Sequence, residues 1–124
     1  MIRITMSTKR LKLTVEGHAM PEESGSWREI CAAASALTQS MMYSAAKYTG
    51  DDPDAEEMKY AKYRGDPGNM LIKIYPEAGA EEGIRQIFRA YGDGMQLLAE
   101  SHPQSVTFIR DGKRIMAKEE KGHE

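Results

Sequence analysis

Residues 26–37, Ser-Trp-Arg-Glu-Ile-Cys-Ala-Ala-Ala-Ser-Ala-Leu, decide the fold because they open the strongest helical pattern in the chain. Ser26 and Glu29 have the spacing of a capping box, in which two side chains satisfy free backbone N–H groups at the start of a helix. Apolar residues then recur at steps of three and four: Ile30, Ala34, Leu37, Met41, Ala45 and Tyr48. Residues 50–53 (Gly-Asp-Asp-Pro) stop the pattern. The sequence therefore predicts a helix over residues 27–48 with one buried face.

Strand patterns lie on both sides of this helix. Residues 1–7 and 11–16 alternate apolar and polar side chains across a short polar connection, which is typical of a β-hairpin. Residues 58–64 and 69–75 flank the turn sequence Gly-Asp-Pro-Gly at 65–68 and predict a second hairpin.

A second helix is predicted over residues 81–101, and a last strand over 105–110. The buried stripe predicted for this helix is Ile84, Ile87, Phe88, Tyr91, Met95 and Leu98. The order β-β-α-β-β-α-β predicts an α/β fold of two layers, in which two helices cover one face of a five-stranded mixed or antiparallel sheet. We expect one domain over residues 1–112 and a charged C-terminal tail over 113–124.

Composition limits the classes of function. The 124 residues carry 17 Lys and Arg, 19 Asp and Glu and a formal net charge of −2. Because the basic residues are scattered among acidic ones along the chain, binding to nucleic acid is disfavoured. No apolar run is long enough for a membrane span, the alternating N-terminus is unlike a signal peptide, and one cysteine makes no intramolecular disulfide. We expect a cytoplasmic protein with no membrane, no metal and no cofactor.

Cys31 and His18 are the candidates for catalysis. His18 follows the end of a predicted strand, and Cys31 lies in the first turns of the predicted helix. A cysteine protease needs a thiolate, an imidazole that takes its proton, and donors for the oxyanion, such as N–H groups near the start of a helix. On residue type and spacing alone, an inert buried cysteine is the more frequent case.

The two motifs resemble those of the ribosomal-processing cysteine protease (Prp) family. That family has Gly-His-Ala after its second strand and a helix that opens with Asp-Ile-Val-Cys-Ala-Ala-x-Ser-Ala-Leu. Residues 17–19 match the first motif, and residues 30–37 match the second closely, including the serine four positions after the cysteine.

The resemblance implies a cysteine endopeptidase that uses no cofactor and forms a homodimer. Cys31 corresponds to the nucleophile, His18 to the general base and acid, and Ser35 to a supporting residue. The implied substrate is a peptide segment, either the N-terminal extension of a large-subunit ribosomal protein or, in phage relatives, part of a virion protein.

Two departures from the family pattern leave a further alternative open. Arg28 replaces an acidic residue three positions before the cysteine, and the loop that contains residues 21–23 is about one residue longer. A catalytically impaired interaction module of the same fold is the alternative that these departures raise.

Overall fold

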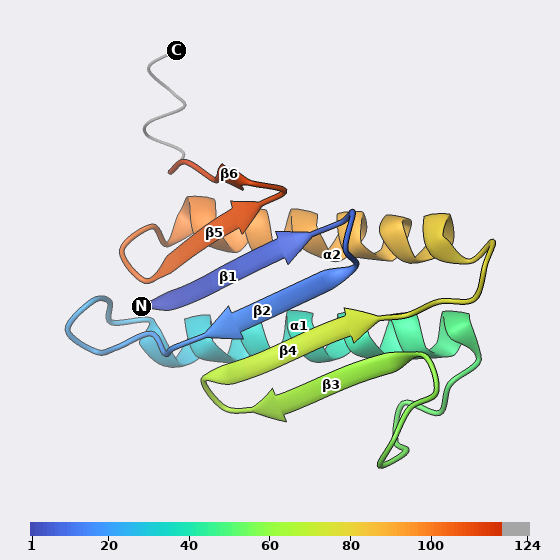
Figure 1. Cartoon of the computed structure of the whole chain (residues 1–124). Helices are drawn as coiled ribbons and strands as arrows, with labels where there is room; N and C mark the ends of the chain where they lie inside the picture. Colours follow the sequence, from blue (N-terminus) through green and yellow to red (C-terminus); the bar gives the residue numbers. More distant parts are fainter. Residues whose placement is uncertain (118–124) are drawn as a thin grey trace.

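The computed structural model describes residues 1–117, which form a six-stranded sheet covered on one face by two helices (Figure 1). The strands are β1 (Ile2–Ser7), β2 (Lys12–Glu16), β3 (Ala61–Asp66), β4 (Asn69–Ile74), β5 (Val106–Arg110) and β6 (Lys113–Arg114). The helices are α1 (Trp27–Thr49) and α2 (Glu81–Ser101). The expected two-layer α/β sandwich is confirmed.

The sheet is mixed, with the strand order β3-β4-β2-β1-β5-β6. Strands β1 and β5 run parallel, whereas the other neighbouring pairs run antiparallel. The two hairpins lie side by side, because β2 pairs with β4 in a register that places Val15 opposite Met70. This pairing brings the end of β2 next to the turn between β3 and β4.

The inward-facing apolar side chains of the strands and the apolar stripes of the two helices pack together in one core between the two layers. The largest fully buried side chains of the sheet and of the helices include Leu13, Ile72, Phe108, Ile30, Met41, Phe88 and Met95. The buried stripe predicted for α1 is correct in the first half of the helix. Near the C-terminus of the helix the buried face is shifted, because Tyr48, which was predicted to be buried, is 53% exposed, whereas Met42 is buried. Both helices have the predicted bounds to within one residue.

Helix α1 begins where the sequence predicts, but without the predicted capping box. Ser26 is the N-cap residue, and its side chain makes no capping hydrogen bond. Its backbone N–H instead donates to Ser24 Oγ at 3.0 Å. The Ser26 N–H, which a capping box would pair with the Glu29 side chain, is thus paired with a hydroxyl of the preceding loop.

The count of five strands is wrong, because residues 113–114 add the sixth strand β6 at the edge of the sheet. Asp111 and Gly112 both have positive φ angles, of 50° and 82°, and form the tight turn that returns the chain beside β5. The ladder is extended by the Ile115 N–H, which donates to Phe108 O at 2.8 Å. Residues 113–114 of the predicted charged tail are thus part of the sheet, and residues 118–124 lie outside the described residues.

Candidate active site

His18 leaves the sheet at the end of β2, directly after Gly17. The Gly17 N–H donates to Gly68 O at 2.9 Å, and Gly17 has a φ of +87°. A Cβ on Gly17 would lie 2.3 Å from the carbonyl oxygen of Met1, so no side chain fits there. The glycine thus lets the chain turn sharply and places His18 beside the β3–β4 turn.

The imidazole of His18 lies against the backbone of Gly68 in that turn. A Cβ built on Gly68 would stand 2.2 Å from His18 Nε2, and the Gly68 φ of +74° also disfavours other residues. From the sequence, Gly68 was predicted only as a turn residue. Its contact with His18 depends on the pairing of β2 with β4, which spacing along the chain does not reveal.

Cys31 is held in place by its neighbour in helix α1. Ile30 is 1% exposed and anchors this turn of the helix in the core, whereas Cys31 is half-buried. The Cys31 thiol donates a weak hydrogen bond to the carbonyl of Ala19, with an Sγ–O distance of 3.8 Å. Ala19 is itself buried and follows His18 directly. Ala19 therefore links the two catalytic candidates, by its peptide bond to His18 and by its carbonyl to the Cys31 thiol.

His18, Cys31 and Ser35 line one cavity of about 200 Å³. Its walls come from five parts of the chain: β1, the end of β2, helix α1, the β3–β4 turn with Pro67 and Gly68, and Met70 in β4. All three residues expected from the sequence are therefore brought together, although the thiol donates to the Ala19 carbonyl and not to the imidazole.

The loop between His18 and Cys31 is tied down by Glu23. One carboxylate oxygen of Glu23 accepts the Met20 N–H at 2.9 Å, and the other lies 2.8 Å from the Met1 ammonium. The same ammonium donates to the carbonyl oxygen of His18 at 2.5 Å. The ammonium and, secondly, the Met20 N–H lower the pKa of Glu23. The sequence marked Glu23 only as part of a longer loop.

Arg28, which replaces the family's acidic residue, does not line the cavity. Its side chain is exposed, and its guanidinium stacks over the Trp27 ring at 4.4 Å from the centroid. The adjacent Glu29 is also exposed and is likewise absent from the cavity wall.

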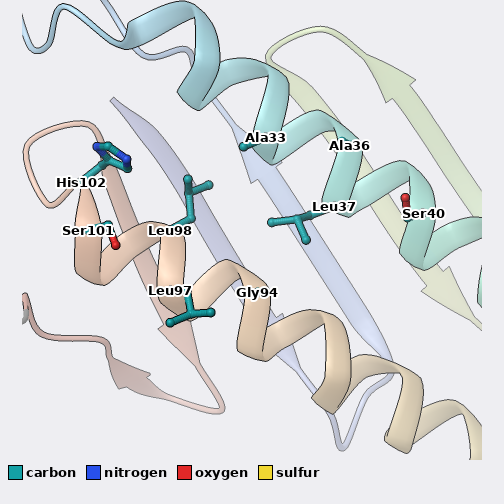
Figure 2. A pocket seen from close by; sticks show the side chains of 9 residues that line it. All are labelled: Ala33, Ala36, Leu37, Ser40, Gly94, Leu97, Leu98, Ser101 and His102. Atoms are coloured by element: carbon teal, nitrogen blue, oxygen red, sulfur yellow. The ribbon is translucent and has the colours of Figure 1, made fainter.

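A larger cavity of about 500 Å³ lies between α1 and α2 and is mostly apolar (Figure 2). Leu37, Leu97 and Leu98 contribute to its walls, and His102 stands at the end of α2 beside it. Among the described residues that line it, His102 is the only titratable group, and neither Cys31 nor His18 reaches it. This second cavity therefore does not contain the thiol chemistry.

Within residues 1–117, no group of three or more His, Cys, Asp or Glu residues is arranged to hold a metal ion. In the same part of the chain, neither helix is long and apolar enough to cross a membrane.

The fold, and the cavity that His18, Cys31 and Ser35 line, fit the class of the cysteine proteases. The family model described as cysteine protease Prp matches residues 1–107, and the chain belongs to this family. None of the curated proteins matches the chain.

Two solved structures share the fold. SMU.848 from Streptococcus mutans is 20% identical, with a TM-score of 0.61, and the match covers 89% of this chain and 93% of the other. The essential ribosomal processing protease Prp from S. aureus, solved with a covalently linked product peptide, is 17% identical, with a TM-score of 0.59. That match covers 88% of this chain and 96% of the other.

Proposed function

We propose that this cysteine protease is an endopeptidase in which Cys31 is the nucleophile and His18 is the general base and acid. The observation that carries the proposal is the cavity that both residues line, in a chain that belongs to the Prp family. Neither the family model nor the two solved structures favour a virion-trimming relative or an interaction module as the function of this chain.

The proposed reaction has two halves. His18 takes the proton of the Cys31 thiol, and the thiolate attacks the carbonyl carbon of the scissile bond. His18 then gives the proton to the leaving amine, the C–N bond breaks, and a thioester on Cys31 remains. Water attacks the thioester with His18 as base, which releases the new carboxylate and restores the thiol.

Donors for the oxyanion are proposed to come from the first turn of α1. The N–H groups of Trp27, Arg28 and Glu29 precede the first intrahelical bond, which the Ile30 N–H makes to Ser26 O at 3.0 Å. Since Ser26 provides no side-chain cap, these donors remain available to a substrate. The positive end of the helix also favours negative charge there.

Ser35 is proposed as a positioning residue. It lies one helical turn after Cys31 and lines the same cavity. Its hydroxyl is able to donate a hydrogen bond to bound peptide or to accept one from water. Replacement by alanine is expected to raise KM more than it lowers kcat.

The proposed substrate is the N-terminal extension of a large-subunit ribosomal protein. The S. aureus structure that shares the fold is described as a ribosomal processing protease with a product peptide, which supports a peptide substrate of this type. We also propose a cytoplasmic location and a homodimer, as the resemblance implies. Light scattering that gives the mass of one 13.9 kDa chain would contradict the homodimer.

The test uses a peptide that spans the end of the N-terminal extension of the large-subunit ribosomal protein from the same organism. Mass spectrometry should show one internal cleavage by the parent chain and none by Cys31→Ser or His18→Gln. His102→Gln is the matched control, because His102 lies outside the site, and it should cleave at the parent rate. Equal cleavage by Cys31→Ser and the parent would refute the assignment.

A further inference from the structure

The face of the sheet opposite the helices is uncovered and carries a row of lysines. In Figure 1 the helices lie behind the sheet, and this open face is turned towards the viewer. Lys12 on β2 pairs in register with Lys73 on β4, and Lys73 pairs with Lys62 on β3. Because neighbouring strands are about 4.8 Å apart, the three lysines occupy a span of about 10 Å.

The register gathers charges that are far apart in the sequence, so the basic residues are not scattered on the surface as they are along the chain. Like charges directly opposite each other in a sheet are destabilising. Within residues 1–117, no ion pair involves Lys12, Lys62 or Lys73. The row therefore costs a small amount of folding free energy and leaves its cations open to an anionic partner.

The lysines surround a hollow of about 290 Å³ on this face. Arg10, Lys12, Lys62 and Lys73 line it together with Leu71 and Tyr75, so no acidic side chain of residues 1–117 contributes to its wall. The ammonium of Lys73 donates to the backbone carbonyl of Arg10, which fixes one wall of the hollow.

An adjacent hollow of about 180 Å³ extends the basic surface with hydroxyl groups. It shares Arg10 and Lys12 with the first hollow and adds Thr5, Ser7 and Thr14. The acidic residues Glu16 and Asp66 lie at the other ends of β2 and β3, four residues and about 13 Å from the lysine row. Lys62 also lines a neighbouring hollow with Glu56 and Glu57, so the positive charge of the face is concentrated at Arg10, Lys12 and Lys73.

An aromatic ring borders the cations. Tyr75 is 57% exposed, and Lys73 Nζ lies 5.2 Å from its ring centroid. Basic grooves that include an exposed aromatic ring are typical of proteins that bind single-stranded nucleic acid, because phosphates contact the cations and bases stack on the ring. An acidic protein segment would use the lysines but would give Tyr75 no stacking partner.

We infer that this basic hollow binds single-stranded RNA. Phosphates lie along Arg10, Lys12, Lys62 and Lys73, and a base stacks on Tyr75. The hydroxyls of Thr5, Ser7 and Thr14 are partners for ribose 2′-hydroxyls, which distinguish RNA from DNA. Since His18 follows the opposite end of β2 from Lys12, RNA and peptide occupy separate places.

The experiment measures fluorescence anisotropy of a labelled 12-nucleotide RNA of mixed sequence at several salt concentrations. The triple variant Lys12→Gln/Lys62→Gln/Lys73→Gln should bind at least tenfold more weakly and show a shallower salt dependence. Tyr75→Ala should weaken binding by about fivefold or more, as expected for one lost stacking contact.

A charge-matched triple variant on the helices, Lys47→Gln/Arg85→Gln/Arg89→Gln, should bind RNA like the parent. The lysine-row variant should also have a higher Tm than the parent, which shows that it is folded. Absence of RNA binding by the parent, or equal loss in both triple variants, would overturn the inference. Equal binding of a DNA 12-mer, or binding of poly-glutamate or anionic phosphatidylserine vesicles in place of RNA, would overturn it as well.

Discussion

The imidazole of His18 lies directly against Gly68, at a point where a Cβ would stand 2.2 Å from Nε2 and 2.7 Å from Cε1. The two residues are far apart in the chain, and the pairing of β2 with β4 brings them together. The position of the proposed catalytic base is therefore set by the turn of another hairpin.

Gly68→Ala should disable the protease more than it destabilises the fold. The added methyl displaces the imidazole, so we expect kcat/KM for the ribosomal peptide to fall at least tenfold. The positive φ angle should cost about 1–2 kcal/mol of folding free energy. Urea unfolding and peptide cleavage measure the two effects separately.

The matched control is Gly112→Ala. Gly112 has a similar φ of +82°, but within residues 1–117 only its chain neighbours have heavy atoms within 4 Å of the position that a Cβ would take there. It should lose similar folding free energy and keep its activity. Similar activity in the two folded variants would show that Gly68 does not position His18.

Glu23→Ala should loosen the loop that joins the proposed catalytic residues. The carboxylate accepts the Met20 N–H and pairs with the Met1 ammonium, so we expect the protection of the Met20 amide from hydrogen exchange to fall. Glu22→Ala is the control, because Glu22 is exposed and makes neither contact. Unchanged protection in Glu23→Ala would contradict the role of Glu23.

The same contact predicts a pH dependence. Because the pKa of Glu23 is lowered in the folded chain, its carboxylate contributes stability at neutral pH, and this contribution is lost as the pH falls through that pKa. Loop protection in the parent should therefore decrease at acidic pH more than in Glu23→Gln. The difference is expected to be small, because the carboxylate is only partly buried.

Local patterns predicted much of this structure. The stripe that begins at Ile30 gave the extent of α1, and strand alternation gave the first hairpin to within one residue. The sixth strand was missed because Lys113 and Arg114 have the composition of a solvated tail and pair with β5 only through a tight turn. A two-residue strand has no periodicity to detect.

The site residues that belong to short continuous motifs were predictable from the sequence. His18, Cys31 and Ser35 were identified from two short segments, and they line one cavity. Gly68 and the lysine row were not identified, because each depends on strand register between distant segments. The register between two distant strands is set by how their faces pack in the folded chain, and this packing is not visible in a single sequence.

Arg28→Gln should change catalysis by less than threefold. Arg28 stacks on Trp27 and does not line the cavity, although it occupies the position of an acidic residue in the family pattern. Tryptophan fluorescence should change, since Trp27 is the only tryptophan. A loss of kcat/KM above tenfold would show that Arg28 acts on the substrate.

If His18 activates Cys31, the thiol is more reactive than a free one, and alkylation detects this without a substrate. We expect iodoacetamide at pH 6.5 to modify Cys31 at least tenfold faster than free cysteine, and His18→Gln to remove that advantage while His102→Gln keeps it. The decisive measurement is the alkylation rate of Cys31, the only cysteine, in these three chains. A rate equal to that of free cysteine, or unchanged in His18→Gln, would contradict the proposed pair.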